Sequence, residues 1–210
     1  MRILGIDPGM GVTGYGVIEE TSAGLSLKRS GEIRTAPQHS FSKRLKHLFD
    51  GLLQVIQQEL PSTVAIEDTF LAKNFKSALK LGQARGAALL AAEFHHLPVF
   101  EYSPTAVKMA VVGYGGATKD QVQQMVSRFL KLQKVLTSEH EADAVAAAIC
   151  HAHSAQFQAK VLASTICGGP CGKRRRRSSD APTPRARMDK AQARFLCGGL
   201  ALGLAKPDPR

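Results

Sequence analysis

Ile3-Leu4-Gly5-Ile6-Asp7-Pro8-Gly9 is the stretch that decides the predicted fold. Its aliphatic residues predict a buried strand, and Pro8-Gly9 predicts a turn at the end of that strand. A carboxylate in such a place is costly unless a cation neutralises it. We therefore predict that Asp7 is the first ligand of a divalent-metal site.

The next segments predict two more strands with no helix between them. Gly9, Gly11 and Gly14 have the G-x-G-x-x-G spacing of a dinucleotide-binding loop, but such a loop must open a helix. Residues 13–18 contain further glycines and β-branched residues, which predict the second strand of a hairpin instead. Residues 25–34 predict a third strand. Three consecutive strands predict an antiparallel meander, with which doubly wound nucleotide-binding folds do not begin.

A helix and a fourth strand then bring a second carboxylate toward the first. Apolar residues at helical spacing predict a helix over 41–60, with Ser42 as its cap. Residues 63–67 predict a short strand that ends in Glu67. The helical crossover makes this strand parallel to the first. If the two strands are neighbours, Asp7 and Glu67 emerge at the same end of the sheet, where sites in α/β sheets usually lie.

The remaining segments complete an α/β fold. They predict a helix over 74–94, a strand over 98–102, a helix over 104–111, a helix that begins at Thr118 with Gln121 at capping-box spacing, and a buried helix over 138–153. The predicted sheet is mixed and five-stranded, with three antiparallel strands followed by two parallel ones, and helices flank it. Gly82 and Gly86 let another backbone approach the helix over 74–94, and that backbone is either the sheet or a second copy of the chain.

The last predicted helix supplies two more candidate ligands. Asp143 lies in a segment that is apolar on nearly all sides, so its charge needs a partner. His140 stands three residues earlier on the same helix face. Together with Asp7 and Glu67, these residues offer oxygen ligands and one imidazole, which suit two Mg²⁺ ions, with Mn²⁺ as a substitute. Two such ions can activate water and hydrolyse a phosphodiester.

Charge divides the chain into two parts. Residues 1–154 hold 16 Lys and Arg against 14 Asp and Glu, a net charge of +2, whereas residues 155–210 hold 12 against 3, a net charge of +9. We predict a nuclease domain over residues 1–154 and a basic, mostly disordered extension over residues 155–210. We find no signal peptide, membrane-spanning run or disulfide framework, which predicts a cytoplasmic protein.

Several motifs resemble those of one known family, the RuvC Holliday junction resolvases. They occur in order at residues 3–9, 13–16, 66–74, 78–86 and 142–146, and the resemblance runs from residue 1 to about 153. It implies an RNase H-like fold that acts as a homodimer. It also implies symmetrical nicks in two strands of a four-way DNA junction, made alongside the RuvA–RuvB branch-migration complex, in DNA recombination and repair.

The resemblance also implies roles for individual residues. Asp7, Glu67 and Asp143 match the catalytic acids of the family, and His140 stands where members have Asp or His. The residues that match DNA contacts are Phe70, Lys73, Lys108 and Lys119. Phe70 matches an aromatic residue that stacks at the junction, and the last two lysines match contacts near the scissile phosphate.

Three alternatives remain open. An ATP-binding fold of the actin and Hsp70 type begins with a similar strand, but it needs a second Asp-Gly phosphate loop and a longer chain. A protein of the same fold could bind junctions without cleaving them, although the matched acids argue against this. A zinc module could use Cys150, His151, His153, Cys167 and Cys171, but their spacing fits no standard pattern.

Overall fold

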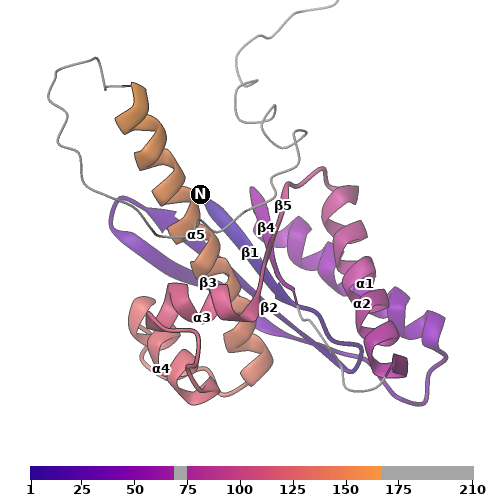
Figure 1. Cartoon of the computed structure of the whole chain (residues 1–210). Helices are drawn as coiled ribbons and strands as arrows, with labels where there is room; N and C mark the ends of the chain where they lie inside the picture. Colours follow the sequence, from indigo (N-terminus) through magenta and orange to yellow (C-terminus); the bar gives the residue numbers. More distant parts are fainter. Residues whose placement is uncertain (69–74, 167–210) are drawn as a thin grey trace, which may run out of the picture. The chain divides into compact units, whose positions relative to one another are not determined.

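A computed structural model describes residues 1–68 and 75–166 (Figure 1). These residues form five strands and five helices in the order β1 (Arg2–Asp7), β2 (Val12–Thr21), β3 (Gly24–Arg34), α1 (Phe41–Glu59), β4 (Thr63–Glu67), α2 (Phe75–Phe94), β5 (Val99–Tyr102), α3 (Pro104–Val112), α4 (Lys119–Phe129) and α5 (Glu139–Ile166). The predictions for Phe70, Lys73 and residues 167–210 lie outside the described residues.

The strands form one mixed sheet in the order β3-β2-β1-β4-β5. The first three strands are antiparallel, while β4 runs parallel to both β1 and β5. The predicted five-stranded sheet, with its meander followed by parallel strands, is therefore confirmed. No helix opens at the glycine motif, because Gly9 and Gly11 lie in the turn between β1 and β2, and Gly14 lies within β2.

Side chains along each strand point alternately to the two faces of the sheet, and each face has its own hydrophobic core. Leu4 and Ile6 of β1 pack in a core with α1 and α2, whereas Ile3 packs in a second core with α3, α4 and α5. Figure 1 shows these two helical layers on opposite sides of the sheet. Because side chains of a strand alternate between faces, Asp7 points to the same face as Ile3. The α5 side of the sheet is therefore the side that receives this carboxylate.

Helix α5 lies unusually close to β1 and β2 because both strands present glycine to it. A Cβ atom at Gly5 would lie 1.9 Å from the carbonyl oxygen of Ala144, and one at Gly14 would lie 1.9 Å from that of His140. Neither distance is compatible with any side chain at these positions. The glycines therefore decide how closely the first turns of α5 approach the end of β1.

Among the local predictions, the capping box of α4 is confirmed and the cap of α1 is wrong. Thr118 and Gln121 form the predicted capping box at the start of α4. Ser42 is not the cap of α1, since the helix begins at Phe41 after Ser40, whose side chain makes no capping hydrogen bond. The predicted boundary after residue 154 falls inside α5, which continues to Ile166. Residues 155–166 contain no Gly or Pro, so nothing in their backbone chemistry ends the helix there.

Gly82 and Gly86 do not serve packing among the residues that the structure describes. A Cβ atom at either position would meet nothing within 4 Å, so the sheet does not require glycine there. Helix α2 instead packs through Ala84, Ala88 and Ala91, which are fully buried. Among the helices of the described residues, none is long and apolar enough to cross a membrane.

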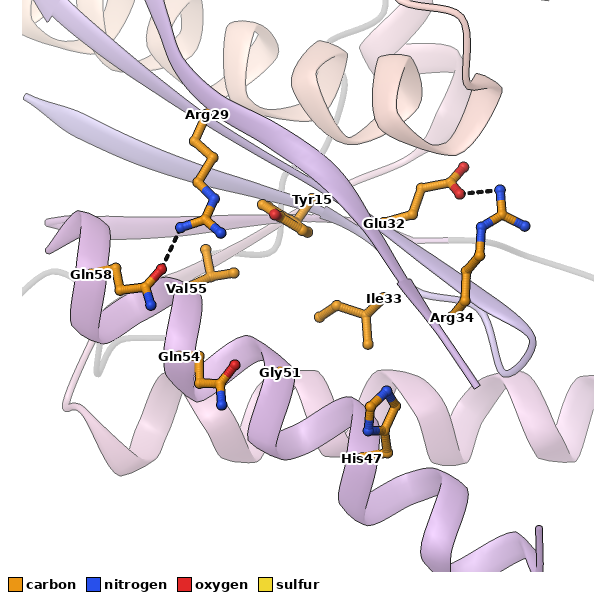
Figure 2. Close-up of a pocket in the computed structure, with 10 residues that line it drawn as sticks. All are labelled: Tyr15, Arg29, Glu32, Ile33, Arg34, His47, Gly51, Gln54, Val55 and Gln58. Carbon is orange, nitrogen blue, oxygen red and sulfur yellow. Dashed lines mark hydrogen bonds and ion pairs between the residues drawn. The ribbon is translucent and has the colours of Figure 1, made fainter. Parts of the chain in front are cut away.

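A hollow with a volume of about 240 Å³ lies between β3 and α1 (Figure 2). Tyr15, Ile33 and Val55 contribute to its wall, and Gly51 leaves space in it. None of the four candidate catalytic residues lines this hollow, so it is separate from the site described next.

Candidate active site

Two carboxylates lie at neighbouring strand ends on the α5 face of the sheet. Ile6 of β1 pairs with Ile66 of β4, so Asp7 and Glu67 are the next residues of two adjacent parallel strands. Ala65 belongs to the core beneath α5, and alternation therefore directs Glu67 to that same face. Asp7 is only 7% exposed. The register of β1 and β4 thus places the two strand ends side by side, as predicted.

The first turns of α5 bring the other two candidates to these strand ends. His140 Nδ1 lies 2.8 Å from Asp7 Oδ2, and in the tautomer protonated at Nδ1 it donates a hydrogen bond to the carboxylate. Asp143 lies one turn further along α5, and its carboxylate raises the pKa of Glu67 by repulsion. All four residues predicted from the sequence therefore meet at one end of the sheet.

Two predicted DNA-contacting lysines face the same acids. Lys119 Nζ lies 2.6 Å from Glu139 Oε2 and 3.8 Å from Asp143 Oδ2. Lys108 is close enough to Glu67 to favour the charged form of its carboxyl group. These contacts link α3 and α4 to the site, although they do not test a role in DNA binding.

Burial and mutual repulsion strongly favour the protonated carboxyls. Burial, followed by the negative charges of Asp7 and Asp143, raises the pKa of Glu67 to about 8. Burial, followed by the charge of Asp7, raises the pKa of Asp143 to about 6. Burial also raises the pKa of Asp7, although its hydrogen bond with His140 opposes this rise. Because the three carboxyl groups lie near one another and away from solvent, a nearby positive charge would stabilise their ionised forms.

The donor chemistry of these side chains fits a divalent cation, but their present arrangement does not form a ligand shell. Among the side chains that the structure describes, no three from His, Cys, Asp and Glu are grouped so as to hold a metal ion as they stand. Asp7 is instead paired with His140, and Asp143 lies next to Lys119. Hard carboxylate oxygens with one imidazole nitrogen are donor types that divalent cations such as Mg²⁺ or Mn²⁺ accept in proteins.

Two residues that were not predicted from the sequence, Ser138 and Glu32, hold the start of α5 in place. Ser138 precedes α5, and its hydroxyl and carbonyl oxygens accept hydrogen bonds from the amides of Glu141 and Ala142. Its hydroxyl also donates to Glu32 of β3, which forms an ion pair with Arg34. Figure 2 shows Glu32 and Arg34 on the side of β3 away from α1. The pattern Ser138-x-x-Glu141 was a capping signal that could have revealed Ser138.

Arg85 was also missed as a supporting residue. Its Nη2 lies 2.5 Å from Glu101 Oε2 of β5 and 3.9 Å from Asp68 Oδ1, and Asp68 directly follows Glu67. The Asp68 amide donates to the carbonyl oxygen of Tyr102. Arg85 thus ties α2 to the ends of β4 and β5, where Glu67 leaves the sheet.

The candidate zinc residues in the described part of the chain do not converge. Cys150 is buried, and its thiol faces the carbonyl oxygen of Ala106. The ring nitrogen of His151 lies 2.8 Å from the Tyr102 hydroxyl, and His153 Nδ1 lies 3.2 Å from the carbonyl oxygen of Ala110. These three side chains have separate partners, and Cys167 and Cys171 lie outside the described residues.

The fold and the acidic strand ends together define a class, that of RNase H-like proteins with a carboxylate site on the central strands. Comparisons with known proteins narrow this class. The profile of the family "Crossover junction endodeoxyribonuclease RuvC" matches residues 3–151. The chain therefore belongs to the RuvC family of crossover junction endodeoxyribonucleases.

Individual relatives agree with this assignment. The RuvC protein of Citrifermentans bemidjiense is 53% identical over 159 residues, which cover 76% of this chain and 96% of the relative. That of Geobacter metallireducens is 50% identical over 155 residues, which cover 74% and 94%. The solved structure of T. thermophilus RuvC in complex with Holliday junction substrate is 34% identical, with a TM-score of 0.72, and the match covers 75% of this chain and 96% of that one.

The same fold occurs at much lower identity. The yeast mitochondrial Holliday junction resolvase Ydc2 is 14% identical, with a TM-score of 0.52 over 78% of this chain and 83% of its own. At this identity the likeness concerns the fold alone, and it agrees with the predicted RNase H-like architecture.

Proposed function

We propose that this protein resolves four-way DNA junctions by metal-dependent phosphodiester hydrolysis, in recombination and repair. The observation that carries the proposal is the meeting of Asp7, Glu67, Asp143 and His140 at one end of the sheet in a chain of the RuvC family. A related chain has been solved with a Holliday junction substrate, which supports the same substrate here.

The carboxylates of Asp7, Glu67 and Asp143, with His140, would hold two Mg²⁺ ions, which Mn²⁺ can replace. Bound ions supply an activated water and positive charge for the leaving oxygen. Glu67 loses its proton on binding a cation, because the positive charge offsets the burial and repulsion that raise its pKa. The Nδ1 contact of His140 to Asp7 orients the ring and leaves Nε2 for a metal ion or a water.

Lys108 and Lys119 would hold the phosphate next to these carboxylates. The Lys119 side chain is 56% exposed and that of its partner Glu139 is 59% exposed, so a DNA phosphate can compete for the lysine. Lys108 lies close enough to act on Glu67. We assign Phe70 and Lys73 to DNA binding from the family resemblance alone.

The exposed apolar face of α2, as the described residues form it, supports a homodimer. Phe75, Leu79 and Leu90 are 82%, 54% and 65% exposed, although large apolar side chains on a helix usually face a core. Gly82 and Gly86 leave open space along the same helix, which permits another backbone to approach. We propose that a second copy of the chain covers this face, so that two active sites can nick two strands symmetrically.

Cleavage of a mobile four-way junction, compared with a linear duplex of the same sequence, tests the nuclease proposal. We expect symmetrical nicks in the junction with Mg²⁺ or Mn²⁺ and none with EDTA. Asp7→Asn should abolish nicking and spare junction binding, because it removes a metal ligand without adding charge. Binding of the junction without nicking by the wild-type protein under any metal would favour the non-catalytic alternative.

The dimer proposal has its own test. Leu79→Glu places a charge on the exposed face of α2 and should convert a dimer to a monomer in light scattering, with circular dichroism unchanged. A matched control is Leu60→Glu, which places the same charge at a 72% exposed residue beyond the end of α1. A wild-type protein that is monomeric at assay concentrations would contradict the proposal.

Two further assignments rest on family membership. We propose that the protein works with the RuvA–RuvB branch-migration complex, and stimulation of nicking by that complex would test this. A DNA substrate also supports the predicted cytoplasmic location.

A further inference from the structure

An exposed aromatic side chain lies in the loop that joins α3 to α4. Tyr114 is 47% exposed, and Met109 at the end of α3 is 51% exposed. Tyr114 is not part of either core. Neither residue was assigned a role above. Met109 lies in α3 next to Lys108, and Tyr114 lies between α3 and α4, the helix that carries Lys119.

The Tyr114 ring is held in place rather than left loose. Its hydroxyl donates to Gln121 Oε1 over 2.6 Å, and the same oxygen accepts from the Thr118 amide over 2.9 Å as part of the capping box. The backbone on both sides is also constrained. Gly113 has a φ of +92°, and a Cβ atom at Gly115 would lie 2.7 Å from Thr105 Cγ2. A side chain that is already ordered loses little conformational entropy when it binds a ligand.

The same capping box places this ring at the start of α4. Gln121 belongs to the first turn of α4, which also carries Lys119. Lys119 Nζ lies 3.8 Å from Asp143 Oδ2. Helices α3 and α4 both pack on α5, the helix that carries His140 and Asp143, as Figure 1 shows. The exposed ring therefore lies in the loop between α3 and α4, the two helices whose lysines, Lys108 and Lys119, face the acids.

We propose that the Tyr114 ring is a stacking platform for a base at the crossover of the junction, where the continuous base stacking of a duplex is interrupted, next to the phosphate that is cut. This inference rests on the proposed function and adds a residue that distinguishes junctions from duplexes. Every base has an aromatic face that stacks on a tyrosine, whereas the bases of an intact duplex already stack on one another. The platform would thus favour DNA at a strand exchange point without reading its sequence.

Binding measurements on the full chain test the proposal. The probes are a four-way junction with 2-aminopurine at the crossover and a linear duplex of the same sequence, both in EDTA to prevent cleavage. Tyr114→Ala should weaken junction binding by about 5-fold to 100-fold and duplex binding by less than about 2-fold. The 2-aminopurine fluorescence, quenched by stacking in the wild-type complex, should recover.

Two further variants separate the ring from the hydroxyl. Tyr114→Phe keeps the flat face and should restore junction binding and quenching, whereas Tyr114→Leu keeps the bulk and should not. Phe129→Ala is the matched control, because it removes a 37% exposed ring at the far end of α4. It should leave both affinities unchanged.

The possible failures can be told apart. If Tyr114→Ala and Tyr114→Leu, folded by circular dichroism, bind the junction as tightly as the wild type, the stacking proposal is wrong. Equal losses for junction and duplex, or a Tyr114→Phe loss as large as that of Tyr114→Ala, would also overturn it. If the wild type shows no preference for the junction over the duplex, the proposed function itself fails.

Discussion

Replacing Glu67 by glutamine should remove part of the pH dependence of the protein's stability. The pKa of Glu67 rises from its ordinary value of 4.5 to about 8, so between these values the folded state keeps a proton that the unfolded state releases. The folded state then binds more protons, and the free energy of unfolding falls as pH rises through this window. In the absence of metal, wild-type stability should therefore decline between pH 5 and pH 9.

The size of this effect follows from the same pKa. The difference between 4.5 and about 8, at about 1.4 kcal/mol for each pKa unit, gives an upper limit of about 5 kcal/mol. Solvent at the partly exposed carboxyl screens this value to about 2 to 3 kcal/mol. For a chain of this length, that loss corresponds to about 4 to 12 °C in Tm.

Thermal unfolding in EDTA at pH 5, 7 and 9 measures the effect. Between pH 5 and pH 9, the Tm of Glu67→Gln should fall by about 4 to 12 °C less than the Tm of the wild type. Glu19→Gln is the control, because Lys28 and Arg2 lower the pKa of Glu19, so its contribution does not change above pH 5. Parallel Tm curves for the wild type and Glu67→Gln would refute the account of burial and carboxylate repulsion.

Three other substitutions test how the site is held. Gly14→Ala forces a Cβ atom against the His140 carbonyl, so it should lower the free energy of unfolding by about 1 to 3 kcal/mol in denaturant titrations and slow nicking. At Gly11 an added Cβ atom meets nothing within 4 Å, so Gly11→Ala should have neither effect. His140→Asp should keep activity and shift it toward Mg²⁺ over Mn²⁺, and an inactive protein would mean that His140 does something an oxygen ligand cannot do. Glu32→Ala frees the start of α5, so kcat should fall more than junction affinity, and equal losses would argue against a positioning role.

Much of the fold follows from local sequence signals. The run of residues 3–9, the absence of a helix before residue 34 and the helical spacing of residues 41–59 together define the meander, the crossover and the parallel fourth strand. These signals work because strand alternation and helix periodicity depend on neighbouring residues only. The end of α5 was misjudged, since the change in composition after residue 154 concerns charge, while helix continuation depends on backbone propensity.

The candidate site could be predicted as a set of residues, but not as an arrangement. Strand ends that finish in Asp7 and Glu67, and an acid in an apolar helix, are visible in the sequence, and the family resemblance connects them. The roles of Glu32, Ser138 and Arg85 could not be foreseen, because each acts on residues distant in the sequence.

The sequence by itself determined which residues form strands and helices, and which acids stand at their ends, because those properties are local. Only the tertiary structure decided that Lys119 lies next to Asp143, that His140 lies next to Asp7, and that Tyr114 stands exposed in the loop before α4. The physical reason is that side chains from β1, α4 and α5 meet only after Gly5 and Gly14 allow α5 to lie against the sheet. Their electrostatic coupling then depends on distances of a few ångströms that no local pattern encodes.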